Sequence, residues 1–149
     1  MNLHKLILTE NACYKAGRTI DVKGIMVHST GADNPDLSRY VPGNEEIGFN
    51  TNGNHWDQSN AEWKEKFGEP LNKCVHAFIG KLADGSVGMV QTLPWNCRGW
   101  HAGMSAGNTR YIGFEICEDG LVDPDYFKAT RDAAVELVAE LCRTFKLDP

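Results

Sequence analysis

The segment YIGFEIC, residues 111–117, constrains the fold of this chain more than any other stretch. Its apolar residues recur at every second position, which is the period of a β-strand with one buried face. The opposite face carries Glu115, and an ionised carboxylate is costly to bury unless another group compensates it. Two interpretations stay open: this face meets a functional site, or the face is simply solvated or Glu115 pairs with Arg98 or Arg110.

Three further strands are predicted from short apolar runs. GIMVH at 24–28 is followed by STGADNP, in which Gly31 and Pro35 break the strand. CVHAFIG at 74–80 and VGMVQ at 87–91 flank the turn LADGS and predict a hairpin.

Helices are predicted between and after these strands. SNAEWKEKFGEP predicts a short helix capped by Ser59 or Asn60. The clearest helix covers 124–146, because Asp123 can cap it, Pro124 suits its first turn and its apolar residues recur at helical spacing. Strands interleaved with helices predict an α/β fold with a mixed central β-sheet flanked by helices.

Length and composition limit the possible partners. The 149 residues suit a single domain, and the net charge of −5 argues against a nucleic-acid binder. No apolar run approaches the roughly 20 residues that span a bilayer, so no membrane partner is expected. The apolar run near the start is too short for a signal peptide, which predicts synthesis in the cytoplasm. Residues 36–54, rich in Asn, Gly and Pro, are expected to form a surface excursion.

The cysteines are odd in number, widely spaced and without a CxxC pair. They are therefore expected to form neither a structural zinc knuckle nor a disulfide framework. Most of them should be buried, reduced and inert. The five are Cys13, Cys74, Cys97, Cys117 and Cys142.

Three histidines lie where α/β domains place their sites, at strand ends and in adjacent loops. His28 ends a predicted strand, His76 lies on another, and His101 follows Trp100 in a Gly-rich loop. A single histidine is more often a surface or core residue than a ligand. No HExxH or closely spaced pair is present, so the local zinc signal is weak.

Four segments in order, GIMVHSTG, VHAFIGKLADGSV, WHAG and YIGFEICED, resemble the type 2 N-acetylmuramoyl-L-alanine amidases. That family includes phage endolysins and is related to peptidoglycan recognition proteins. The resemblance runs from about Lys23 to the final helix. It implies a zinc-dependent hydrolase that cuts the amide bond between N-acetylmuramic acid and the L-alanine of the stem peptide. Such an enzyme acts on the bacterial cell wall, here after phage- or lysis-mediated release.

The resemblance also implies roles for single residues. His28 matches the first zinc ligand, and Glu115 matches the acidic residue that acts near the metal-bound water. Zinc would lower the pKa of that water to about 7, and Glu115 would pass its proton to the leaving nitrogen. His76 falls where relatives place a Tyr or His lining the site and could stabilise the oxyanion. Trp100 and His101 border the groove and are expected to bind substrate.

One feature departs from the family pattern. The second and third zinc ligands of the family, a His and then a Cys or Asp, follow the last long helix, whereas this chain stops at Pro149. We therefore expect residues 1–149 to be a C-terminally incomplete amidase domain, folded but zinc-poor and nearly inactive, because a catalytic zinc needs three protein ligands. A site made by His28 with His76 and His101 is the less favoured arrangement.

Two other functions compete with the amidase. One is a non-catalytic muropeptide-binding module of the same fold, which the missing ligands favour. The other is a structural or interaction protein that docks through residues 36–70. The presence of both His28 and Glu115 favours the enzyme.

Overall fold

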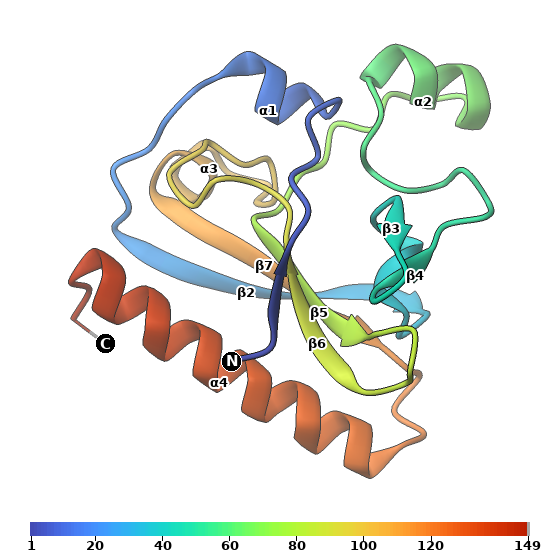
Figure 1. Ribbon diagram of the computed structural model, residues 1–149. Helices are drawn as coiled ribbons and strands as arrows, with labels where there is room; N and C mark the ends of the chain where they lie inside the picture. Colours follow the sequence, from blue (N-terminus) through green and yellow to red (C-terminus); the bar gives the residue numbers. More distant parts are fainter. Residues whose placement is uncertain (149) are drawn as a thin grey trace.

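The computed structural model describes residues 1–148 and has a five-stranded sheet at its centre (Figure 1). Its strands are Leu3–Lys5 (β1), Gly24–Asp33 (β2), Ala77–Lys81 (β5), Val87–Gln91 (β6) and Tyr111–Glu118 (β7). The strand order is β1-β6-β5-β7-β2. Strands β2, β7 and β5 run parallel, β6 is antiparallel to β5, and β1 is parallel to β6. The mixed sheet predicted from the sequence is confirmed.

The other elements surround this sheet. They are α1 (Ala12–Ala16), the 3-10 helix η1 (Leu37–Arg39), β3 (Gly43–Asn44), β4 (Gly48–Phe49), α2 (Asn60–Phe67), α3 (Ser105–Arg110) and α4 (Pro124–Phe145). No helix within residues 1–148 is long and apolar enough to cross a membrane.

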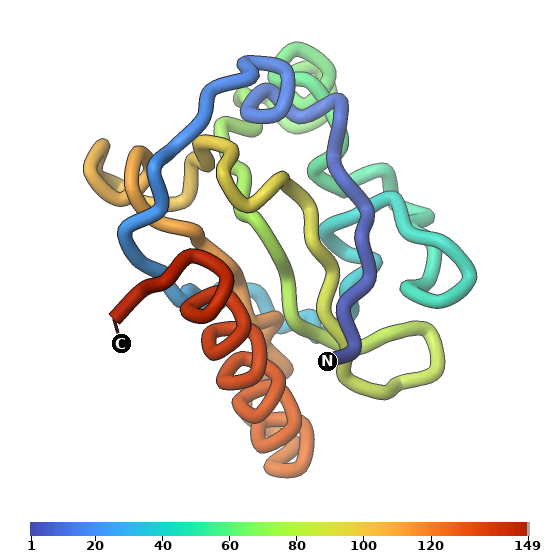
Figure 2. The backbone as a smooth tube through the Cα atoms, turned by 60° about the vertical axis from the view of Figure 1, so that its left-hand side comes forward, coloured from blue at the N-terminus to red at the C-terminus, as the bar shows by residue number. Residues whose placement is uncertain are grey.

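Helix α4 covers one face of the sheet (Figure 2). It begins as predicted, with the Asp123 side chain accepting hydrogen bonds from the backbone N–H groups of Asp125 and Tyr126. Its buried Leu137 and Leu141 belong to the same core cluster as Ile112, Phe114 and Ile79 of the sheet. The apolar face of the 111–117 strand therefore faces α4, and Glu115 faces the other way.

The 36–54 segment covers part of the opposite face, so its description as a surface excursion is wrong. Leu37, Tyr40, Val41 and Ile47 are buried there. The Tyr40 ring stacks on Phe78 of β5 with ring centroids 4.6 Å apart. These apolar residues are scattered among turn residues without a helical or strand period, which is why pattern alone did not reveal a core segment.

Strand β2 is longer than predicted. It continues past His28 to Asp33, with an irregularity in its pairing to β7 between Ser29 and Asp33. Gly31 lies within that stretch with φ of 62°, a backbone conformation that glycine adopts readily. The expected break is thus a distortion of the strand and not its end.

Cys13 and Cys74 form a disulfide, which corrects the expectation that the cysteines lack such a bond. The bridge links α1 to the segment that leads into β5, across a sequence separation of 61. Sequence spacing could not show that these segments meet. Cys97, Cys117 and Cys142 are free, and Cys97 and Cys117 are buried, as predicted.

Breaking the disulfide is expected to lower the free energy of unfolding by about 2–4 kcal/mol, because a bridge over a long loop restricts the unfolded chain. Urea unfolding with and without a reductant measures this change. The Cys13→Ser/Cys74→Ser variant is the control, since its unfolding should not respond to reductant. Equal midpoints for the oxidised and reduced natural chain would contradict the expectation.

Candidate functional site

His28 and Glu115 lie side by side on the face of the sheet away from α4. They are register partners in the parallel strands β2 and β7. Their neighbours Val27 and Ile116 line a groove beside α4, and side chains alternate along a strand, so His28 and Glu115 point to the other side. The two residues that the resemblance assigns to the zinc ligand and the acidic residue therefore share one face of the sheet.

His101 contacts His28 directly and does not lie at the edge of the site as expected. Its Nδ1 is 3.1 Å from Nε2 of His28, and its own Nε2 is 3.1 Å from the carbonyl oxygen of Tyr111. A carbonyl only accepts, so Nε2 of His101 carries the hydrogen and Nδ1 accepts one from His28. Burial lowers the pKa of His101 to about 4, with the nearby His76 acting in the same direction, so this ring is neutral at pH 7.

Asn108 holds the His101 loop in place, and sequence reasoning missed this residue. Its Oδ1 accepts hydrogen bonds of 2.8 Å from the backbone N–H groups of both His101 and Ala102, and its Nδ2 donates to the Ala102 carbonyl. Asn108 is buried in the short helix α3, where only a Gly- and Ser-rich loop was apparent from sequence.

His76 does not open onto the cleft, which corrects the expectation that it lines the site. Its side chain is fully buried. Nε2 lies 2.8 Å from the carbonyl oxygen of Cys97, and Nδ1 accepts a 3.0 Å hydrogen bond from the backbone N–H of Gly113. Both ring nitrogens are therefore engaged with backbone, and the ring supports His101 from behind, with centroids 5.9 Å apart.

Glu115 has an unusual environment for a carboxylate. Its Oε2 is buried without a hydrogen-bond partner in the described chain, and neither Arg98 nor Arg110 forms an ion pair with it. Burial raises the pKa of Glu115 to about 7, the charge of Glu118 adds to this, and Lys73 opposes it. The interpretation in which Glu115 pairs with Arg98 or Arg110 is thus wrong.

Glu115 and His101 open into a cleft of about 320 Å³. Trp100, which is 52% exposed, forms part of its wall, as expected for a groove residue. The complete lining is Trp56, Lys73, Val75, Trp100, His101, Ala102, Gly103 and Glu115. A carboxyl group with a pKa near neutrality beside neutral imidazoles can take up and release a proton at pH 7.

The described residues do not form a complete zinc site. Within residues 1–148 no group of three or more His, Cys, Asp or Glu side chains is arranged to hold a metal ion. His28 and His101 approach each other, but His76 is committed to backbone and Cys117 is buried in the apolar core. A catalytic zinc needs three protein ligands, so these residues offer at most two.

Gly113→Ala is expected to displace His101 and to lower the free energy of unfolding by about 1–3 kcal/mol. A Cβ on Gly113 would lie 2.4 Å from Cγ and Nδ1 of the His101 ring, which is held by Asn108 and Tyr111. Gly103→Ala in the same loop is a matched control, because a Cβ there meets nothing within 4 Å. Urea unfolding and the imidazole NMR signals report the two effects, and equal behaviour of the two variants would contradict this packing.

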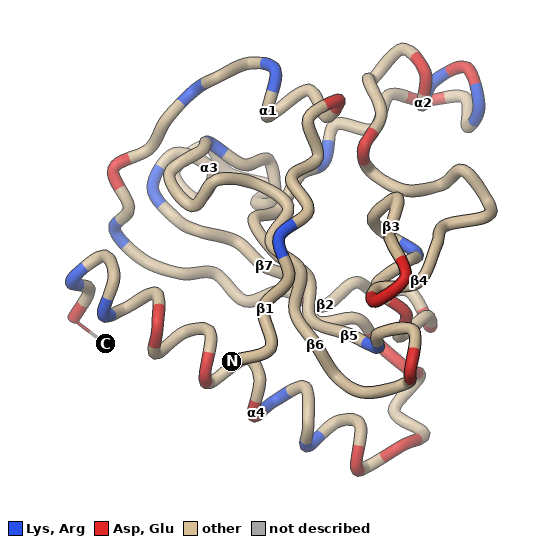
Figure 3. The backbone as a smooth tube through the Cα atoms, in the orientation of Figure 1, with Lys and Arg blue, Asp and Glu red and all other residues tan. Residues whose placement is uncertain are grey.

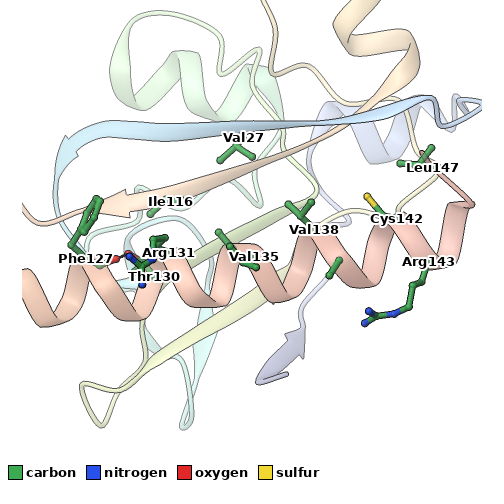
Figure 4. A pocket seen from close by; sticks show the side chains of 12 residues that line it. Val27, Ile116, Phe127, Thr130, Arg131, Val135, Val138, Cys142, Arg143 and Leu147 are labelled. Atoms are coloured by element: carbon green, nitrogen blue, oxygen red, sulfur yellow. Dashed lines mark hydrogen bonds between the residues drawn. The ribbon is translucent and has the colours of Figure 1, made fainter. Parts of the chain in front are cut away.

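A larger hollow than this cleft lies elsewhere. It is an apolar groove of about 820 Å³ between β2 and α4 (Figure 4). Val27 and Ile116 form its strand side, and Phe127, Val135 and Val138 belong to its helix side. It holds no carboxylate or histidine and opens on the other face of the sheet from Glu115, so it is not the candidate site.

Comparisons with known proteins identify one family and several structures with a similar fold. The family profile of N-acetylmuramoyl-L-alanine amidase matches residues 18–149. A mutant of PlyL has a similar structure, with a TM-score of 0.64 and 21% identity over 99% of this chain and 78% of that one. The catalytic domain of XlyA gives 0.60 and 23% over 99% and 80%. Staphylococcus aureus hydrolase AmiA, in complex with its ligand, gives 0.61 and 21% over 100% and 58%. No curated protein matches the sequence.

Proposed function

Because the chain belongs to the N-acetylmuramoyl-L-alanine amidase family, we propose that it is a peptidoglycan hydrolase. The bond it would cut joins N-acetylmuramic acid to the L-alanine of the stem peptide. One observation carries the proposal: Glu115, with its pKa raised to about 7, lies in an open cleft beside His28 and His101. Burying a carboxylate without a partner costs free energy, and carboxylates with such raised pKa values are typical of functional sites.

Glu115 is the proposed general base and acid. In its ionised form it accepts a proton from the attacking water as the water oxygen bonds to the scissile carbonyl carbon. It then delivers that proton to the leaving alanine nitrogen as the carbon–nitrogen bond breaks. A pKa near 7 suits both steps at neutral pH, because the group gains and loses the proton readily.

Zinc is the proposed cofactor, with His28 as one ligand. When bound, zinc supplies a Lewis acid and lowers the pKa of its water. The family resemblance puts two further ligands after the last long helix. The oxyanion role expected of His76 does not suit its geometry, since its Nε2 already donates to Cys97. We assign His76 a positioning role behind His101 instead.

Trp100 and His101 are the proposed substrate contacts. The Trp100 ring is exposed at the wall of the cleft, where an aromatic face can pack against a sugar or a peptide. The substrate would be bacterial peptidoglycan, as in the endolysins and amidases of this family.

A non-catalytic muropeptide-binding module is the second candidate. The absence of a three-ligand group within residues 1–148 favours it. Such a module would use the same cleft and the same Trp100 wall, but it would bind the intact amide without breaking it.

The decisive comparison is between the 149-residue chain and the chain extended by whatever its gene encodes after Pro149. Each is incubated with purified cell walls and zinc, and the release of new alanine amino groups is measured. Amide cleavage by either form supports the amidase. Wall binding without cleavage by both forms supports the binding module, and neither binding nor cleavage contradicts both candidates.

A further inference from the structure

A second, smaller pocket adjoins the cleft and has basic side chains in its lining. It has a volume of about 110 Å³ and is bounded by α1, the start of α2 and the segments before β5 and α3. Its charged residues are Arg18, Lys73 and Arg98, and no Asp or Glu lines it. Figure 3 shows Lys and Arg positions around α1 and α3, although the chain as a whole is acidic, with a net charge of −5.

Arg18 and Arg98 are held next to each other by backbone pairing. Thr19 and Cys97 form an antiparallel bridge, which sets Arg18 opposite Arg98, and the Arg98 N–H donates to the Arg18 carbonyl at 2.8 Å. Like charges in directly opposed positions destabilise a pair of strands. This juxtaposition is therefore unfavourable unless an anion lies between or beside the two guanidinium groups.

None of the three basic groups has an acidic partner among residues 1–148. The ion pairs of the structure include Lys15 with Glu10 on the neighbouring helix, but none with Arg18, Lys73 or Arg98. The Nε of Arg98 is also buried without a hydrogen-bond partner. A buried guanidinium donor left unsatisfied is costly, and a carboxylate is the group that its planar donor set fits best.

The basic pocket and the cleft share one wall, since Lys73 and Trp100 line both. Cys74 and Trp100 exchange two backbone hydrogen bonds of 3.1 Å, which fixes this shared wall. The basic pocket is therefore a direct neighbour of the cleft that holds Glu115.

We propose that Arg18, Lys73 and Arg98 form a subsite that binds a free carboxylate of the stem peptide, on the peptide side of the scissile amide. This inference rests on the proposed function, because that function determines which part of the ligand lies toward the subsite. It makes the chain selective for stem peptides whose carboxylates are free over those in which they are amidated. Arg98 gives direction to the contact through its guanidinium plane, and Lys73 connects the subsite to the cleft.

The test is an NMR titration of the 149-residue chain with N-acetylmuramoyl-L-alanyl-D-glutamate and with its diamide, in which both carboxylates are primary amides. We expect the acid to bind about tenfold or more tightly than the diamide, as for a charge-assisted hydrogen bond. Arg98→Gln and Arg18→Gln should each reduce that ratio toward one without weakening binding of the diamide. Arg110→Gln removes an exposed arginine outside both pockets and should keep the ratio.

The outcomes separate the subsite from the proposed function. Equal binding of acid and diamide by the natural chain, no binding of either, or an acid preference that survives both arginine substitutions would each overturn the subsite. Cleavage of the muramoyl–alanine bond is followed in the same samples. Acid preference without cleavage by any form of the protein would leave the subsite standing and overturn only the hydrolase.

Discussion

Glu115→Gln is expected to lower turnover of the muramoyl–alanine amide by about 10²–10⁴-fold in the active protein, the usual contribution of a positioned general acid–base group. Glutamine keeps the size of the side chain but cannot accept the proton of the attacking water. Glu115 is not a proposed zinc ligand, so the metal content should change little. Rates on purified cell walls, with zinc content measured on the same preparations, check both parts.

Glu115→Gln should also raise the free energy of unfolding of the metal-free chain. Burial raises the pKa of Glu115 from 4.5 to about 7, so between these values the folded chain holds more protons than the unfolded chain. The free energy of unfolding of the natural chain therefore falls as the pH rises from 4.5 to about 7. Relative to the natural chain, Glu115→Gln should gain roughly 1–2 kcal/mol between about pH 4.5 and pH 8, after allowance for partial solvent exposure.

Glu118→Gln is the matched control for the turnover measurement. It removes a carboxylate from the same strand and should leave turnover nearly intact, because Glu118 does not line the cleft. If Glu115→Gln retains full turnover in a form that cleaves cell walls, Glu115 is a structural carboxylate. If its stability difference does not change with pH, the burial of the ionised group has no energetic cost.

In a form of the protein that carries the remaining ligands, His28→Ala is expected to remove zinc and turnover together, since it deletes a proposed ligand. The natural 149-residue chain should itself be purified with far less than one zinc per molecule, because its described residues offer at most two ligands. Metal analysis and calorimetric zinc titration measure both quantities. His4→Ala, which removes an imidazole that pairs with Glu46 outside the cleft, is the control.

A different result would reassign His101. Stoichiometric zinc in the 149-residue chain, lost in both His28→Ala and His101→Ala, would mean that His101 is a ligand. The contact of 3.1 Å between His101 Nδ1 and His28 Nε2 makes it the first residue to test, ahead of His76 and Cys117.

The regular elements could be predicted from the sequence because their signals are local. The alternation in residues 111–117, the hairpin around LADGS and the Asp123 cap each depend on a few neighbouring residues, and each is present in the structure. Strand β1 and helices α1 and α3 were missed because they are short and carry no complete period.

The site could be predicted only in part, since its details depend on contacts between distant segments. The strand positions of His28 and Glu115 place them on one face, and this much follows from periodicity and resemblance. The burial of His76 depends on backbone groups of Cys97 and Gly113, which no local pattern reveals. The support that Asn108 gives to His101 depends likewise on how one loop folds back on itself.

The parallel pairing of β2 with β7 has a consequence for how the protein acquires its site. These strands come from distant parts of the chain: the Gly31 N–H donates to the Glu118 carboxylate across 87 residues. Contacts so distant in sequence form slowly, because the entropy of closing a large loop is lost before the pairing is gained. His28 and Glu115 meet only when β7 docks between β5 and β2, so no early folding intermediate that lacks this docking contains the pair. Recovery of the site during refolding should therefore follow the slowest step of sheet assembly.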